Sequence, residues 1–167
     1  MPIRAATAAD HARIVALNAA EVAQTSAMDA ARLAELEALA CAHWVVEHDG
    51  EAVAFLLAMD ETAAYDNDNF RWFAERLPRF VYIDRIVVDA RAASQGIGKQ
   101  LYQRLADHAR ERGIDALVCE YNLDPPNPGS KAFHDRLGFR EIGQQRVAGG
   151  QKLVSMQLLN LREGSPS

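Results

Sequence analysis

The sequence predicts a mixed fold of the α/β or α+β class, in which helices pack against a central sheet. The main observation is that short apolar runs, typical of strands, alternate with segments whose apolar residues recur at helical spacing. A second observation is size, because 167 residues, 49% of them hydrophobic, can bury one core without disulfides or metals. We therefore expect a single domain over residues 1–160 and a frayed polar tail over residues 161–167.

The first 60 residues predict one strand, two helices and a hairpin. Thr7 or Asp10 can cap the first helix and Asp29 the second, because such side chains accept from free backbone N–H groups. Asp49 and Gly50 tolerate positive φ, which predicts the hairpin turn. The predicted elements are a strand at 2–7, helices at 11–24 and 28–42, and two strands within 43–60.

The second half predicts strands alternating with helices. The connection at 60–79 is acidic at first and then aromatic, and connections of this length in a compact domain are usually functional or disordered. Its aromatic residues favour an ordered segment. We expect these side chains to lie in the core more than to form a wall of the substrate site. The predicted elements are a short helix at 69–77, a strand at 79–89, a helix ending at Gly113, a strand at 115–122, a helix at 130–137 stopped by Gly138, and a hairpin at 139–161.

Charge and composition exclude several classes of partner. The formal net charge of −5 and the pI near 5.5 argue against broad binding of nucleic acid or anionic membranes. No apolar run approaches the ~18 residues of a membrane span, and the N-terminus does not resemble a signal peptide. Cys41 and Cys119 have no metal-like spacing with a histidine, so we expect buried free thiols, no metal and a cytoplasmic protein.

Two glycines, Gly96 and Gly98, stand where the strand at 79–89 gives way to a helix. Each costs roughly 0.5–1 kcal/mol relative to Ala, so we expect a function for the pair. A helix start has free N–H groups and partial positive charge, and a glycine-rich turn lets an anion approach them. Lys99 is a cation in the first turn, where it opposes the helix dipole. This placement is explained if a phosphate is bound in front of it. The alternative is a simple turn beside a surface lysine.

The turn matches neither of two common nucleotide signatures. The dinucleotide fingerprint fails because Leu101 stands at its third glycine, and no Walker A pattern is present. The window from Ala93 to Gly98 instead resembles the acetyl-CoA motif of the GNAT acetyltransferase superfamily, R/Q-x-x-G-x-G/A at the start of the central helix. Both glycines match, whereas Ala93 replaces the family's Arg or Gln. Arg91 is close enough to substitute for it.

A second motif extends the resemblance over nearly the whole chain. The pattern N-x-x-x-x-A-F-H-x-x-L-G-F runs from Asn127 to Phe139 and is similar to a late helix of that superfamily. His134 stands where the family often has a tyrosine. The order of elements is also that of the family.

The resemblance implies a mostly antiparallel sheet of about seven strands, flanked by about four helices and splayed between strands 4 and 5. It implies acetyl-CoA as co-substrate, with the pyrophosphate held by amides of residues 95–99 and the thioester carbonyl polarised by an N–H near Val87 or Val88. The cofactor-binding residues that it implies are Ile86, Val87, Val88, Ser94, Gln95, Gly96, Ile97, Gly98, Lys99, Asn127, Ser130, Phe133 and His134.

The expected catalytic residues are Glu120, Asp84 and His134. A lysine-like amine is almost fully protonated at pH 7, so a base must remove a proton. Glu120 ends an apolar strand and Asp84 interrupts another, and both are candidate bases. The alternatives are an ion pair of Glu120 with Arg85 or Arg136, and of Asp84 with Arg85 or a neighbouring strand. His134 occupies the family's acid position, or else lies on the helix surface.

The sequence therefore predicts an N-acetyltransferase that moves an acetyl group from acetyl-CoA to an amine by direct attack in a ternary complex. The amine is a small molecule or a protein amine, and the terminal strands can pair two subunits into a homodimer. Cys119 adjoins Glu120, but strand alternation turns it to the opposite face. The alternatives are a non-catalytic acyl-CoA-binding module and a nucleotide-phosphate binder of another fold.

Overall fold

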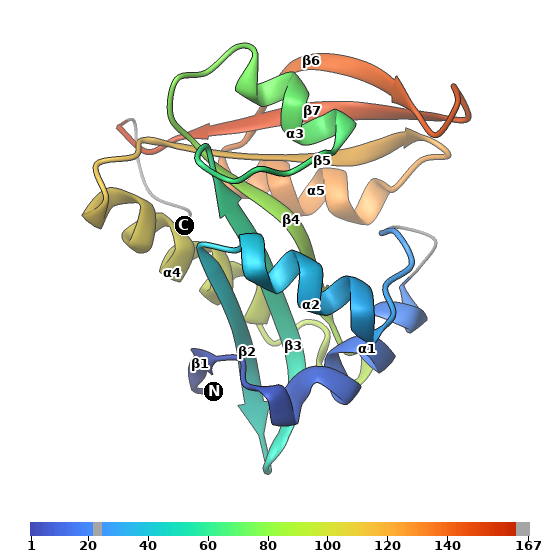
Figure 1. Cartoon of the computed structure of the whole chain (residues 1–167), viewed down its shortest axis with the longest axis vertical. Coiled ribbons are helices and arrows are strands. Elements are labelled where there is room, and N and C mark those ends of the chain that lie inside the picture. Colours follow the sequence, from blue (N-terminus) through green and yellow to red (C-terminus); the bar gives the residue numbers. More distant parts are fainter. Residues whose placement is uncertain (22–24, 163–167) are drawn as a thin grey trace. The chain divides into compact units, whose positions relative to one another are not determined.

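The computed structural model describes residues 1–21 and 25–162 (Figure 1). Short 3₁₀ turns over Ala8–Asp10 and Ala90–Ala92 precede α1 and α4. The elements, in chain order, are β1 (Ile3–Ala5), α1 (His11–Ala20), α2 (Ala30–Leu39), β2 (Ala42–His48), β3 (Glu51–Asp60), α3 (Asp68–Ala74), β4 (Val81–Val88), α4 (Ile97–Glu111), β5 (Ala116–Asp124), α5 (Pro128–Leu137), β6 (Arg140–Val147) and β7 (Lys152–Asn160).

The sheet confirms the predicted fold class. Its seven strands within the described residues have the order β1-β2-β3-β4-β5-β7-β6. β1/β2, β2/β3, β5/β7 and β7/β6 pair antiparallel, whereas β4 and β5 are parallel at Val81–Leu117 and Tyr82–Val118. The part of the chain that the structure describes contains five α-helices, whereas the resemblance implies about four; the short α3 corresponds to the helix that the sequence predicts at 69–77. The predicted splay between β4 and β5 stays a prediction.

Contacts between Cα atoms divide the chain into two compact units, and β4 and α4 each run from one into the other. The first consists of Met1–Met59 and Ile83–Tyr102, the second of Asp60–Tyr82 and the chain from Gln103 onward. Each unit is described by itself below. A single domain over 1–160 stays a prediction.

In the first unit, local signals set the ends of the elements as expected. Thr7 and Asp10 form a capping box before α1, and the Asp29 carboxylate caps α2 by accepting from the Arg32 N–H at 2.8 Å. The β2–β3 turn has left-handed backbone at Asp49 (φ 52°) and Gly50 (φ 77°). α1 ends at Ala20, earlier than the predicted residue 24, and residues 22–24 lie outside the described part.

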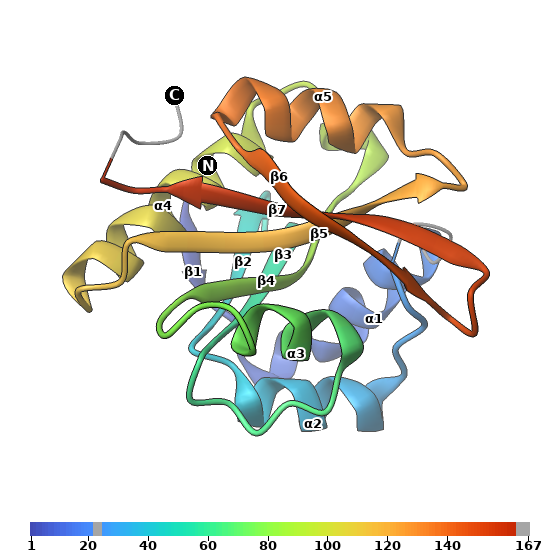
Figure 2. The ribbon, with the colours of Figure 1, turned by 90° about the horizontal axis from the view of Figure 1, so that it is seen from above.

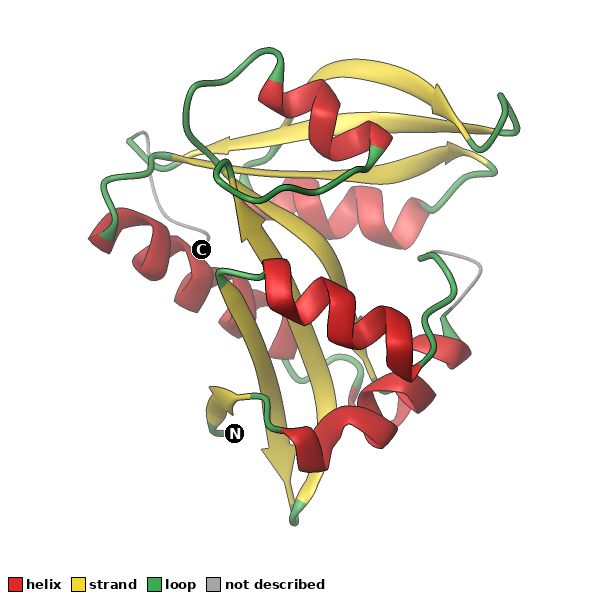
Figure 3. Ribbon diagram, in the orientation of Figure 1, coloured by secondary structure: helices red, strands yellow, loops and turns green. Residues whose placement is uncertain are grey.

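In the second unit, helices cover both faces of the β5–β7–β6 sheet. Figure 2 shows α5 on one side of these strands and α3 on the other. The connection from β3 to α3 has no regular structure over residues 63–67 (Figure 3), yet Tyr65 is buried in it. Phe70 and Phe73 of α3 are also buried, which confirms the core interpretation of these aromatic residues.

The first residue of the predicted tail is held by a backbone hydrogen bond. Leu161 is buried, and its N–H donates to the Asp115 carbonyl at 2.8 Å. A frayed tail stays a prediction. Arg162 forms an ion pair with Asp115. The remainder of the predicted tail, residues 163–167, lies outside the described residues.

Candidate functional site

The turn between β4 and α4 contains two residues with left-handed backbone. Asp89 follows β4, and its side chain accepts from the Arg91 N–H at 2.9 Å, which starts the 3₁₀ turn Ala90–Ala92. Ser94 then has φ 71° and Gly96 φ 74°. A left-handed conformation costs a non-glycine residue of order 1–3 kcal/mol, so the surrounding chain imposes it on Ser94.

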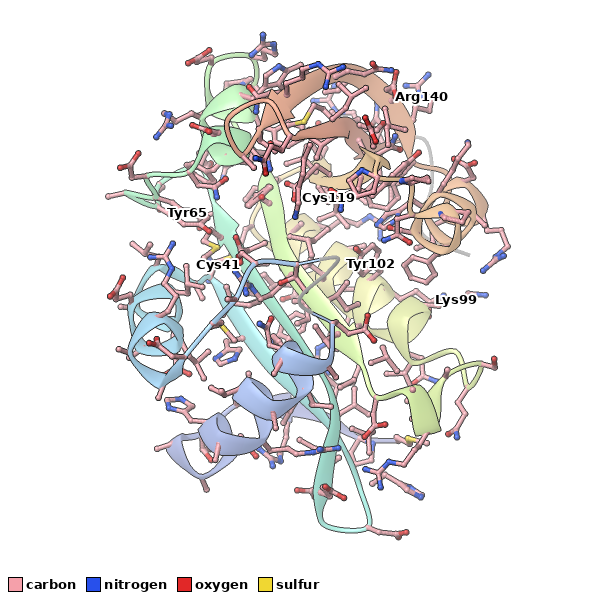
Figure 4. The ribbon with its side chains drawn as sticks, turned by 90° about the vertical axis from the view of Figure 1, so that its right-hand side faces the viewer. Cys41, Tyr65, Lys99, Tyr102, Cys119 and Arg140 are labelled. Carbon is pink, nitrogen blue, oxygen red and sulfur yellow. The ribbon has the colours of Figure 1, made fainter. Side chains whose placement is uncertain are left out.

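This turn is exposed, whereas the helix that follows is anchored. Residues 93–96 are exposed, and a Cβ on Gly96 would meet no heavy atom within 4 Å. Ile97 is buried, and the Gln100 N–H donates to the Gly96 carbonyl at 3.0 Å. Lys99 is exposed, and its side chain extends away from the start of α4 (Figure 4). Accessible amides at a fixed helix start fit a pyrophosphate, so the residues present suit the expected cofactor.

The predicted substitute for the missing arginine lies in an ion pair. The Arg91 guanidinium donates to Asp89 at 2.8 Å, and Arg13 donates to the same carboxylate at 2.6 Å. The hydrogen bonds from Arg91 are the main cause that holds the pKa of Asp89 well below its usual range. Arg91 therefore secures the 3₁₀ turn, while Ala93 leaves the neighbouring position small and exposed.

Asp84 has the alternative role that the sequence allowed for it. Its carboxylate accepts from Arg85 at 2.7 Å, and both side chains are only 4% exposed. Arg85 also donates to the Asn18 side chain at 3.1 Å and to the Ser26 carbonyl at 3.0 Å. The ion pair with a buried guanidinium supports the structural alternative for this carboxylate, and a role of Asp84 as a base stays a prediction.

The three β4 residues expected at the thioester alternate in burial. Val87 is buried, while Ile86 and Val88 are half-buried. Beyond them, the Asp89 N–H donates to the Val53 carbonyl of β3 at 2.8 Å, which fixes this end of β4. A role of the N–H near Val87 or Val88 as a thioester contact stays a prediction.

Glu120 accepts a hydrogen bond from a buried tyrosine. The Tyr82 hydroxyl donates to the Glu120 Oε1 at 2.6 Å, which differs from the expected alternative of an ion pair with Arg85 or Arg136. Tyr82 pairs with Val118 in the parallel β4/β5 ladder, so its side chain shares a face with Glu120, two residues further along β5. Glu120 is half-buried.

Asn122 follows Glu120 on the same face of β5 and has an unsatisfied donor. It is 8% exposed, and its Nδ2 is buried without a hydrogen-bond partner. On the opposite face of β5, Cys119 lies across from Gln157, and the Tyr121 hydroxyl accepts from the Gln157 side chain at 3.3 Å. Cys119 is thus buried, outside any disulfide and turned away from Glu120, as predicted, whereas Cys41, also expected to be buried, is half-buried.

His134 lies in an aromatic environment and not on the helix surface. It is 5% exposed, and its ring packs 5.7 Å from Tyr121 and 5.1 Å from Phe139, centroid to centroid. The Nδ1 lies 2.7 Å from the Ser130 carbonyl, which can only accept, so Nδ1 carries the hydrogen. Burial lowers the pKa of His134. Neutral His134 presents Nε2 as an acceptor, which disagrees with the predicted acid role.

The other α5 residues expected at the cofactor form the start of that helix. The Asn127 side chain caps it by accepting from the Ser130 N–H at 3.2 Å. The Ser130 hydroxyl lies 3.2 Å from the Nδ1 of His134, and Phe133 stacks edge-to-face on the same ring at 5.2 Å. Phe133 is half-buried. These side chains therefore stabilise α5 itself, in addition to any contact that they make with a ligand.

Sequence reasoning missed Tyr82 as the partner of Glu120. The signal available was alternation, because Tyr82 and Asp84 share one face of their strand and Glu120 and Asn122 one face of theirs. Which residues meet across strands depends on register, which the sequence does not state.

The described residues contain no group of three or more His, Cys, Asp or Glu side chains that could hold a metal ion. Among the helices placed by the structure, none has the length and apolar character needed to cross a membrane.

Comparisons with known proteins agree with the resemblance that the sequence motifs indicate. Residues 11–139 match the acetyltransferase (GNAT) family. Glucosamine 6-phosphate N-acetyltransferase 1 of Oryza sativa subsp. japonica is 35% identical over 75 residues, which are 45% of this chain and 42% of the rice protein. The chain thus covers less than half the length of that relative.

Solved structures show the same fold. The yncA protein of Salmonella typhimurium, solved with its cofactor acetyl-CoA, has a TM-score of 0.72 and 27% identity, with 96% of this chain and 94% of that chain covered. The ribosomal-protein-alanine N-acetyltransferase of Brucella melitensis has a TM-score of 0.72 and 24% identity, with 96% of this chain and 100% of that chain covered. The match over residues 11–139 spans most of the sequence, so the chain belongs to the acetyltransferase (GNAT) family.

Proposed function

We propose that this protein is an N-acetyltransferase that transfers the acetyl group of acetyl-CoA to an amine. The observation that carries the proposal is the exposed turn before α4, with left-handed backbone at Ser94 and Gly96 and a helix start behind it. Family membership and the acetyl-CoA in the yncA structure support this cofactor. The cytoplasmic location and a homodimer through the terminal strands stay predictions.

Roles on the cofactor side follow from the chemistry of each group. When bound, acetyl-CoA supplies a thioester-activated acetyl group and a thiolate leaving group. In this proposal, the amides of residues 95–99 bind the pyrophosphate, and Lys99 adds a flexible cation. Ser94 contacts the cofactor beside this turn, and an N–H near Val87 or Val88 donates to the thioester carbonyl. The cofactor contacts that the resemblance implies for Asn127, Ser130, Phe133 and His134 stay predictions.

Glu120 is the base in this mechanism. It receives a proton from the ammonium form of the amine, directly or through water, because only the free amine has the lone pair needed for direct attack. Its half-buried position on β5 leaves it close to water while Tyr82 holds it. We do not assign His134 as the acid, because the neutral ring offers an acceptor at Nε2.

The proposal is tested by thiol release from acetyl-CoA with a panel of amines. The panel contains an amino-sugar phosphate, chosen from the name of the rice relative, an amino acid, a polyamine and a peptide with a free N-terminus. Amine-dependent release, and loss of ~10²–10⁴-fold in turnover at pH 7 for Glu120→Gln with CoA affinity retained, are expected. Tight CoA binding without release for any amine would instead indicate a non-catalytic acyl-CoA-binding module. Competition of ATP for the same site would indicate a nucleotide binder.

A further inference from the structure

The Tyr82–Glu120 pair is held from both strands of the parallel ladder. The hydroxyl of Tyr82 and the Oε1 of Glu120 are 2.6 Å apart, which is typical of an O–H donor bonded to a carboxylate. The backbone register Tyr82–Val118 fixes the two Cα positions relative to each other. The contact therefore follows from the strand pairing and does not depend on a loop.

The phenol cannot easily turn away from Glu120. Tyr82 is 1% exposed, and three aromatic rings surround it. The centroid distances from its ring are 6.4 Å to Tyr65, 5.8 Å to Phe70 and 6.0 Å to Phe73. Three aromatic residues of segment 60–74, which the sequence favoured as core over a substrate wall, thus fix the direction in which Tyr82 donates.

Several elements within the described residues pack against the pair. Tyr82 faces Glu120 from β4, and β7 places the uncharged Met156 opposite it. Behind Tyr82, Tyr65 contributes a second phenol from the segment before α3. On β5 itself, the next residue on this face is Asn122, an uncharged amide.

We propose that Tyr82 is a positioning residue that holds the Glu120 carboxylate in its ionised form and in a fixed orientation, so that Glu120 receives the amine's proton at Oε2. The proposal rests on the role of Glu120 in the proposed function. A hydrogen bond donated to a carboxylate stabilises the charged form, and the bond to Oε1 limits rotation of the group. The amine N–H bond breaks as the Oε2–H bond forms, and nitrogen keeps the electron pair for attack.

The test is the pH dependence of kcat/KM for Tyr82→Phe, measured with the best amine of the panel. Loss of the hydrogen bond should move the acidic limb to higher pH by about one unit, a tenfold change in the ionisation constant. The rate deficit should therefore shrink as the pH rises. Tyr65→Phe is the matched control, because it removes a phenol from the same aromatic cluster and should leave the limb in place.

A double-mutant cycle separates positioning from general damage. In a Glu120→Gln background, Tyr82→Phe should cause no further change in kcat/KM, because its effect acts through the carboxylate. An additive loss in the double variant, or an unmoved acidic limb in Tyr82→Phe, overturns the proposal.

A second measurement is independent of activity. In protein with ¹³C-labelled glutamate, the Glu120 carboxyl, assigned from the Glu120→Gln spectrum, should titrate at higher pH in Tyr82→Phe than in the wild type. Equal titration overturns the proposal. Full turnover of Glu120→Gln at pH 7 would instead refute the base assignment in the proposed function, while the carboxyl titration still reports on Tyr82.

Discussion

Single residues show how closely the second unit is packed. A Cβ on Gly143 would lie closer to the Cζ2 of Trp72 than real contacts allow, beside an irregularity in the β6/β7 ladder. Gly143→Ala should lower the free energy of unfolding by about 1–3 kcal/mol because the Trp72 ring must shift. Urea denaturation measures this loss. In a Trp72→Leu background the same change should cost clearly less, and an equal cost would show that the contact is not the reason.

Asn122 makes a contrasting case. Replacement by Leu, of similar volume, removes a buried donor without a partner, so the free energy of unfolding of the ligand-free protein should stay level or rise. The matched control is Asn18→Leu, because Asn18 is fully buried, donates to the Ser26 carbonyl at 3.0 Å and accepts from Arg85. That control should lose about 1–3 kcal/mol. If Asn122→Leu loses as much as the control, Asn122 has a partner in solution.

At the scale of elements, the turn before α4 offers a gain-of-affinity prediction. Ala93 is exposed where the resembling motif has Arg or Gln, and Arg91 is paired with Asp89. Ala93→Arg should tighten CoA binding several-fold, since a charge-assisted hydrogen bond is worth about 1.5–3 kcal/mol before solvent screening. Ala93→Leu, which adds length without charge, should not. Calorimetry that finds the two variants equal would show that no phosphate lies within reach of position 93.

Elements also mark the limit of what the sequence could predict. Turn residues determined the β2–β3 hairpin and periodicity determined α2, because both signals are local. The Tyr82–Glu120 contact joins residues 38 positions apart and depends on the register of β4 on β5, which no local signal contains. The burial of His134 likewise depends on which side of α5 meets β5, so the sequence left surface and site equally open.

For the whole molecule, one buried and two half-buried histidines predict a pH dependence of stability. Burial lowers the pKa values of His43, His108 and His134 below the ordinary 6.5. These groups therefore take up protons more readily in the unfolded chain, and stability must fall as the pH drops through about 6.5. The urea midpoint should be lower at pH 5.5 than at pH 7.5, a range that avoids the titration of most carboxylates.

Variants assign that slope to particular side chains. His134→Gln should flatten the dependence on pH, whereas His48→Gln, at the exposed end of β2, should not. A wild-type midpoint that is constant or rises toward pH 5.5 would contradict the neutral state of these histidines, including the acceptor role of the Nε2 of His134.

Binding of CoA measured by calorimetry tests the cofactor site at the start of α4 most directly. Three forms are compared: wild type, Gly98→Glu, and Ala30→Glu, which adds the same charge to the exposed first turn of α2. A glutamate at position 98 places a side chain and a negative charge in the proposed pyrophosphate-binding site, so CoA binding should be lost. Ala30→Glu should bind as the wild type does. A folded Gly98→Glu protein with wild-type affinity for CoA would contradict the assignment of this turn.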